Sequence, residues 1–79
     1  MKLEIITPDK KLYEGNVTSV SVPGTKGTFV ILHNHAPIIS TLNKGKVKIV
    51  TAGSKSETID IEGGIIEVKK NNIIVLADM

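Results

Sequence analysis

A chain of 79 residues has room for one small domain, and without cysteine it can form neither a disulfide nor a thiolate metal site. Its net charge is +2, its ten basic residues are all lysines, and its aromatic residues are one Tyr and one Phe, so readout of nucleic acid by arginine and stacked rings is not expected. No apolar run approaches the roughly 20 residues that span a bilayer, and we interpret residues 1–6 as a strand rather than a signal peptide.

The apolar residues are mostly β-branched. Ile, Val and Thr supply 27 of the 79 residues, whereas Ala supplies three and Leu five. Side chains branched at Cβ are stiff and pack well on a pleated surface. The composition therefore predicts an all-β domain.

Short alternating segments separated by Gly, Pro and Asn turns follow one another along the whole chain. This spacing predicts about nine or ten short strands and no long helix, a pattern typical of a sandwich or a barrel. The strands are too close in sequence for helical crossovers, so we expect mainly antiparallel sheets. The expected strands are residues 3–7, 11–14, 17–22, 28–32, 38–42, 46–52, 57–62, 65–69 and 73–77.

The alternation also predicts which side chains face the core and where the backbone is unusual. Val and Ile at 20, 22, 47, 49, 59 and 61 should point inward. The Gly63-Gly64 pair indicates a bulge or a close backbone approach, where a Cβ does not fit. A hairpin turn is expected at residues 70–72, because Asn-Asn tolerates positive φ better than most pairs.

The stretch from Gly27 to Ile39 does not alternate cleanly. It holds the only Phe, both histidines and one of the three prolines. An apolar run that enters His-Asn-His and is then broken by Ala-Pro predicts a strand that leaves the core and bends at the surface. Such corners carry function more often than the strands do.

His33 and His35 form an H-x-H pair, which in a strand would place both imidazoles on one side, next to one metal ion. A zinc site needs a third ligand, and no further histidine exists, so only carboxylates could complete it. We favour solvated or interface histidines and keep a small metalloenzyme as one alternative. The sequence shows no G-x-S-x-G elbow and no phosphate-binding glycine loop, which favours a binding or assembly role over catalysis.

A second alternative is a free-standing binding module or a lipoyl or biotinyl carrier, which would have this size and β character. Lys26, Lys44 and Lys70 are the turn lysines that could carry the group. None of them has the Asp-Lys-Ala or Met-Lys-Met neighbours that such carriers show.

Three motifs in fixed order carry a resemblance to a known family. They are His-Ala-Pro-Ile-Ile at 35–39, Gly-Gly-Ile-Ile-Glu-Val at 63–68 and Asn-Ile-Ile-Val-Leu-Ala-Asp at 72–78. Leu-Tyr-Glu-Gly at 12–15 and Val-Ser-Val-Pro-Gly at 20–24 agree as well. With these motifs the chain resembles, over essentially its whole length, the N-terminal β-domain of the epsilon subunit of F-type ATP synthases, the equivalent of the mitochondrial delta subunit.

The resemblance implies one domain over residues 1–79, a flattened sandwich of two β-sheets. It implies a non-catalytic, cofactor-free subunit of the central stalk that couples the gamma subunit to the membrane c ring during proton- or sodium-driven ATP synthesis. The chain would then lie at the cytoplasmic face of the bacterial inner membrane, peripheral to it. Residues 24–28 would face the ring, and His35 with its neighbours would face gamma and the ring. The implied interface residues are Thr25, Lys26, Gly27, Thr28, His35, Ala36, Pro37, Ile38 and Ile39.

The sequence departs from the family at three places. Thr28 stands where members often carry an acid, and His33-Asn34 stand where they carry Pro-Gly; Asn can still adopt the left-handed conformation there. Members usually continue past the Ala-Asp match into a C-terminal helical hairpin. The chain would then be either a truncated form or a naturally short form, of which we favour the second, and on this sequence we expect neither inhibition by the hairpin nor ATP binding.

Overall fold

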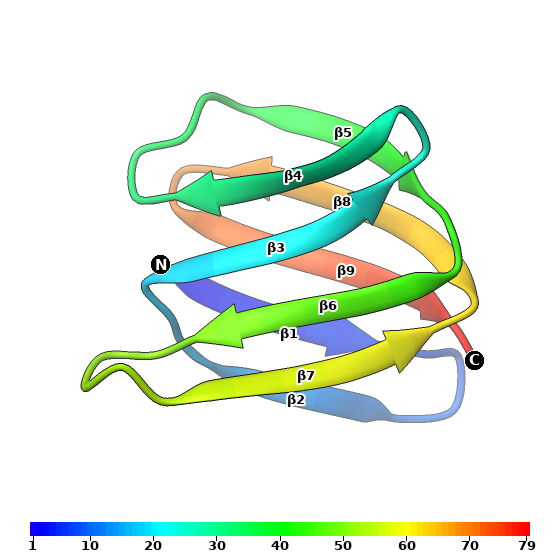
Figure 1. The fold of residues 1–79 in the computed structure, drawn as a ribbon, viewed down its shortest axis with the longest axis horizontal. Helices are drawn as coiled ribbons and strands as arrows, with labels where there is room; N and C mark the ends of the chain where they lie inside the picture. The colour runs from blue at the N-terminus through cyan, green and yellow to red at the C-terminus, as the bar shows by residue number, and fades with distance from the viewer.

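A computed structural model describes residues 1–79 and contains nine strands and no helix (Figure 1). No element is therefore a helix with the length and apolar character needed to cross a bilayer. The all-β prediction and the predicted strand number are confirmed. The strands are β1 (Lys2–Ile6), β2 (Lys11–Asn16), β3 (Ser19–Gly24), β4 (Gly27–Leu32), β5 (Ile38–Leu42), β6 (Gly45–Val50), β7 (Ser56–Ile61), β8 (Gly63–Lys69) and β9 (Asn72–Asp78).

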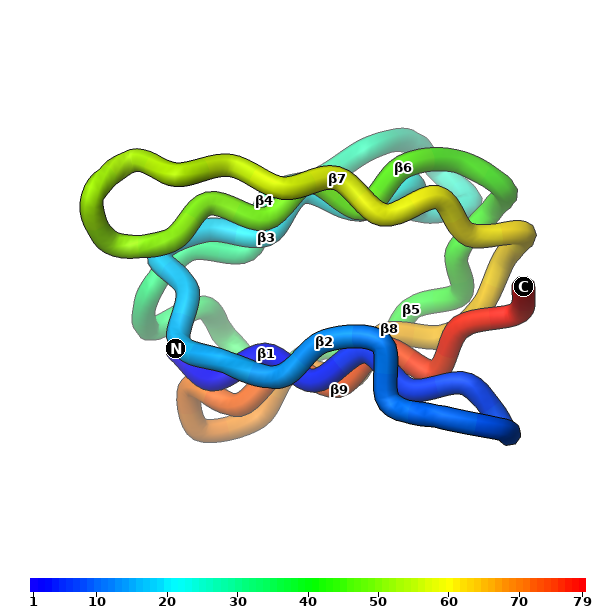
Figure 2. Tube along the Cα trace, turned by 90° about the horizontal axis from the view of Figure 1, so that it is seen from below, coloured from blue at the N-terminus to red at the C-terminus, as the bar shows by residue number.

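The strands lie in two facing layers (Figure 2). One layer has the order β4-β3-β6-β7 and the other β5-β8-β9-β1-β2, and a single pair, Gly24 opposite Leu42, joins β3 to β5. Because of this pair the nine strands form one continuous sheet that folds over on itself. The expected flattened sandwich is confirmed. All neighbours are antiparallel except β1 and β9, so the first and last strands of the chain pair in parallel.

The space between the layers is filled by β-branched and leucine side chains. The predicted inward positions Val20, Val22, Val47 and Ile49 are fully buried, and Ile61 nearly so, whereas Ile59 is only half-buried near the open edge of β7. Fifteen buried hydrophobic residues form one cluster drawn from both layers. They are Leu3, Ile5, Val17, Val20, Val22, Ile31, Leu42, Val47, Ile49, Ile61, Ile66, Val68, Ile73, Val75 and Ala77.

The predicted close backbone approach at Gly63-Gly64 is confirmed. Gly64 has φ +151°, and a Cβ there would collide with the carbonyl oxygen of Leu76 on the neighbouring strand β9. Just before this point the chain passes from one layer to the other, and Glu62 N donates to Asp78 O at 2.7 Å. The glycine pair therefore lets the start of β8 pair closely with β9.

Two predicted turns differ in detail. The connection between the expected strands 17–22 and 28–32 shrinks to Thr25 and Lys26, because Pro23 continues β3 and its carbonyl accepts from Asn43 N at 2.7 Å. In the β8–β9 hairpin the positive φ angles fall on Lys70 (52°) and Asn71 (61°), one residue earlier than expected. Pairing of Lys69 with Asn72 sets this register and leaves only two residues for the turn.

Candidate interaction surface

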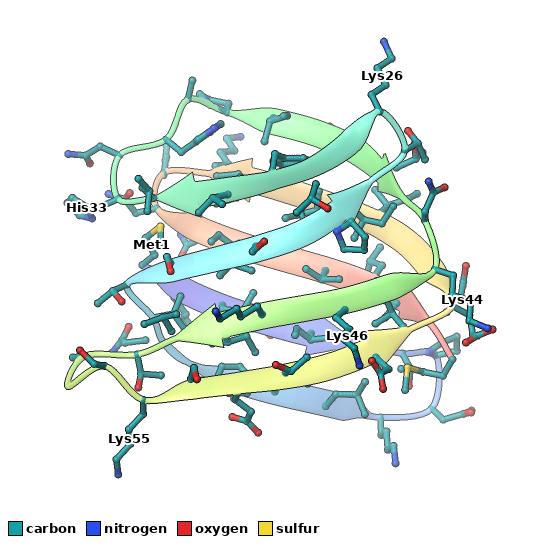
Figure 3. The ribbon with its side chains drawn as sticks, in the orientation of Figure 1. Met1, Lys26, His33, Lys44, Lys46 and Lys55 are labelled. Carbon is teal, nitrogen blue, oxygen red and sulfur yellow. The ribbon has the colours of Figure 1, made fainter.

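The predicted interface residues lie along one open edge of the sandwich, where β4 and β5 end the two layers (Figure 1). The structure divides them between two ends. Figure 3 places Lys26 at one end of β4 and His33 at the other. β5 returns from the corner towards the β3–β4 turn, so Ile38 and Ile39 share a groove with residues 24–29. His35, Ala36 and Pro37 lie outside that groove, in the corner.

The β3–β4 turn is fastened to β5. Thr25 N donates to Thr41 O at 3.1 Å, and the two hydroxyl oxygens, Thr25 Oγ1 and Thr41 Oγ1, are 3.0 Å apart. Gly24 allows the tight turn between β3 and β4, since a Cβ there would lie 2.7 Å from both Gly27 O and the Phe29 ring. Lys26 is exposed at the tip and takes part in no salt bridge (Figure 3). The turn therefore offers one unpaired cation on a fixed backbone.

The corner, residues 33–37, is a turn and not a strand. Asn34 adopts φ 63°, as expected for an Asn in the place of Gly. His35 N donates to Leu32 O at 3.1 Å, and His35 Nδ1 donates to Ala36 O at 2.7 Å. Because Nδ1 is engaged with a carbonyl, Nε2 of the half-buried ring is the nitrogen left to bond with a partner.

The backbone of the corner does not give His33 and His35 the strand geometry that the metal hypothesis requires. The left-handed conformation of Asn34 removes the strand alternation that would place His33 and His35 side by side. No group of three or more His, Cys, Asp or Glu residues comes together anywhere in the chain in a way that could hold a metal ion. The corner is therefore better described as a surface for contact than as a metal centre.

An apolar surface that the sequence interpretation missed covers the outside of the β5-β8-β9-β1 layer. We call it the outer apolar face, and its most exposed members are Ile39 (72%), Leu76 (53%) and Ile65 (44%). Strand register places Ile65 opposite Leu76, and Leu76 opposite Ile6. Ile74 completes the outer apolar face, and the exposed Glu67 lies between it and Ile39. The sequence signal for this face was the apolar pairs 38–39, 65–66 and 73–74. Consecutive residues of a strand point to opposite faces, so such a pair places apolar side chains on both.

The outside of the other layer is polar over β3, β6 and β7, whereas its edge strand β4 exposes Val30 (50%) and Leu32 (57%). Lys46 on β6 faces Asp60 on β7, with Nζ and Oδ1 2.8 Å apart. Ser21, Lys48 and Thr58 form a polar row across β3, β6 and β7. The polar surface over β3, β6 and β7 therefore differs in character from the outer apolar face, which is suited to burial against an apolar partner.

A small ion-pair network occupies the β1–β2 edge. Lys11 Nζ lies 3.1 Å from Glu14 Oε1 and 3.4 Å from Glu4 Oε2, and Lys2 Nζ lies 3.4 Å from Glu14 Oε2. The hydrogen bond from Lys11, followed by that from Lys2, lowers the pKa of Glu14, and the bond to Glu14 raises the pKa of Lys11. These groups are exposed, so the network adds little to stability. It marks the edge opposite the corner as solvated.

Comparison with known proteins identifies relatives over the whole chain. The family model described as "ATP synthase, Delta/Epsilon chain, beta-sandwich domain" matches residues 1–79. The ATP synthase epsilon chain of Leptospira interrogans serovar copenhageni is 45% identical over 78 residues, which cover 99% of this chain and 61% of the relative. That of Chlorobium limicola is 42% identical over 77 residues, covering 98% of this chain and 88% of the relative. The chain thus spans about three fifths of the Leptospira protein and most of the Chlorobium protein.

Solved structures with a similar fold come from mitochondrial complexes. A chain in the Euglena gracilis ATP synthase OSCP/F1/c-ring structure superposes with a TM-score of 0.91 at 18% identity, covering 98% of this chain and 49% of that one. A chain in the Tetrahymena thermophila central stalk/c-ring structure has a TM-score of 0.82 at 17% identity, covering 99% and 63%. At these identities the likeness concerns the fold.

Proposed function

Because the chain belongs, over its whole length, to the family of the beta-sandwich domain of the ATP synthase delta/epsilon chain, we propose that it is a rotor subunit that joins the gamma subunit to the c ring. It would act without a catalytic residue of its own, transmitting torque through contact area. In the assembled enzyme it would lie at the cytoplasmic face of the membrane, peripheral to it. The family match favours this function over the carrier alternative.

The difference between the two outer surfaces carries the proposal. A rotor subunit needs a surface that stays buried in a permanent complex, and such surfaces are more apolar than the rest of a protein. The outer apolar face meets this need, and Ile39, its most exposed member, adjoins the corner through β5. We assign the outer apolar face and the corner to gamma.

The opposite end of β4 suits a different contact. Thr25, Lys26, Gly27 and Thr28 form a narrow polar tip, which fits the polar loops of a c ring better than an apolar groove. Since the tip and the corner lie at opposite ends of β4, one subunit could meet the ring at one end and gamma along the rest. The stiffness of a packed β-sandwich would keep the two contacts in fixed relation.

A pair of matched substitutions tests the proposal. Ile39→Lys places a charge at the most exposed apolar residue of the assigned interface, whereas Thr58→Lys places the same charge on the polar surface of the other layer. Both sites are exposed, so both variants should melt within a few degrees of the wild type. In pull-downs with gamma and the c ring, Ile39→Lys should lose most of the bound gamma and Thr58→Lys should retain it. Wild-type protein that never associates with gamma would contradict the assignment.

A further inference from the structure

Two asparagines from distant parts of the chain pair their side chains at the corner. Asn34 N donates to Asn71 Oδ1 at 2.8 Å, and Asn71 Nδ2 donates to Asn34 Oδ1 at 3.0 Å. Asn34 lies in the β4–β5 corner and Asn71 in the β8–β9 turn, 37 residues later. In Figure 1 both turns lie at the same end of the sandwich. The two bonds therefore connect two loops that flank the same end of the paired strands β5 and β8.

The backbone fixes how the two amides meet. A peptide N–H can only donate, so the N–H of Asn34 turns the side-chain oxygen of Asn71 towards itself. This leaves the Asn71 NH₂ group to donate to the oxygen of Asn34. The pair is also tied to the first strand, since Lys2 N donates to Asn71 O at 3.0 Å. The corner is thus linked through Asn71 to β1, a strand of the same layer as β5.

Both asparagines hold a backbone conformation that glycine would adopt more easily, with φ 63° and 61°. The other hydrogen bonds of the corner backbone, from His35 N to Leu32 O and from His35 Nδ1 to Ala36 O, do not reach the β8–β9 turn. We propose that Asn34 and Asn71 are positioning residues, whose paired amides hold the corner, and with it His35, in one orientation for docking. This proposal rests on the assignment of the corner to gamma. Its physical basis is that a loop ordered before binding loses less entropy when the partner arrives.

Amide hydrogen exchange at residue 34 reports the paired amides directly. Asn71→Gly removes the acceptor, and glycine keeps the φ of the turn without strain. The protection factor of the Asn34 N–H should fall roughly fivefold, the equivalent of one ordinary hydrogen bond. Lys70→Gly is the matched control, because Lys70 is in the same turn with φ 52° and its side chain makes no hydrogen bond. It should leave residue 34 unchanged.

Changing Asn34 and Asn71 to Asp distinguishes loss of the paired hydrogen bonds from the effect of adding a charge. Asn34→Asp keeps an acceptor for Asn71 Nδ2, and Asn71→Asp keeps an acceptor for Asn34 N while the Asn34 amide turns over to donate. Each single variant should therefore retain most of the protection at residue 34. The double variant sets two carboxylates against each other and should lose it. Equal and additive losses in the two single variants would overturn the paired geometry.

Binding to gamma tests whether the pairing serves docking. Asn71→Gly should raise the Kd for gamma roughly three- to tenfold, while Lys70→Gly should not. An unchanged protection factor in Asn71→Gly would overturn the pairing itself. Lost protection with unchanged affinity would overturn its role in docking. If the wild type does not bind gamma, the proposed function fails, and the exchange data still decide whether the two amides hold the corner.

Discussion

Gly64 is the residue at which the fold tolerates no side chain. Gly64→Ala would drive a Cβ into the Leu76 carbonyl at a φ of +151°, where alanine is strained even in open space. Overpacking and backbone strain each cost about 1 to 3 kcal/mol, so we expect a loss of about 3 kcal/mol or more in the free energy of unfolding. Urea denaturation measures it.

Gly15→Ala is the control for that prediction. Gly15 also lies in a strand, β2, but a Cβ there would only touch the Tyr13 ring at 3.5 to 3.7 Å, an ordinary van der Waals distance. Its backbone lies outside the positive-φ region. The variant should stay within about 0.5 kcal/mol of the wild type. Equal losses at Gly15 and Gly64 would show that glycine in these strands matters through flexibility and not through the contact with Leu76.

The β3–β4 hairpin is held at its tip by one hydroxyl pair. Thr25→Val keeps the branched shape and removes the bond to Thr41 Oγ1, so the free energy of unfolding should fall by about 0.5 to 1 kcal/mol. Thr28→Val, at an exposed position in the same hairpin that makes no side-chain hydrogen bond, should change it little. The double variant Thr25→Val/Thr41→Val should recover part of the loss, because no hydroxyl is left without its partner. Thermal melts of the wild type, Thr25→Val, Thr41→Val and the double variant give the coupling.

The strands themselves were predictable because their signal is local. Alternation of Val20 and Val22 with Ser19 and Ser21 marks one buried face within six residues of sequence, and β3 follows it. The pairing of strands was not predictable, since it depends on contacts between distant segments. Nothing near Leu3 indicates that β1 pairs in parallel with β9, or that Gly24 of β3 meets Leu42 of β5.

The arrangement of the predicted interface residues also depends on contacts between distant segments. The corner was recognised because His35-Ala36-Pro37 breaks a local pattern, and Asn34 does adopt the left-handed conformation. Its separation from the tip at Lys26 follows from the six-residue length of β4, which a motif does not express. The contact between Asn34 and Asn71 spans 37 residues, and only the folded chain brings these turns together.

At the scale of the molecule, the outer surfaces of the two layers differ. The β4-β3-β6-β7 layer is polar outside over β3, β6 and β7, with the Lys46–Asp60 pair between its strands, and exposes Val30 and Leu32 at its β4 edge. The β5-β8-β9-β1-β2 layer contains both chain ends and carries the outer apolar face. A protein with this asymmetry can present one layer to a partner and the other to water. The apolar core between the layers makes the docking layer depend on the solvated layer for its stability.

The pairing of the first strand with the last predicts that the sandwich unfolds as one unit. Val75 is fully buried in β9, opposite Ile5 of β1 and Ile66 of β8, so Val75→Ala should lower the free energy of unfolding by about 2 to 3 kcal/mol. Val30→Ala, at a half-exposed position on β4, should lower it by less than about 1 kcal/mol. In urea, fluorescence of Tyr13 on β2 and far-ultraviolet circular dichroism should report the same midpoint for each variant, with an unchanged m-value. If the Tyr13 transition precedes the loss of strand signal, the β1–β2 edge unfolds separately, and the rigid coupling of the two layers assumed for torque transmission does not hold.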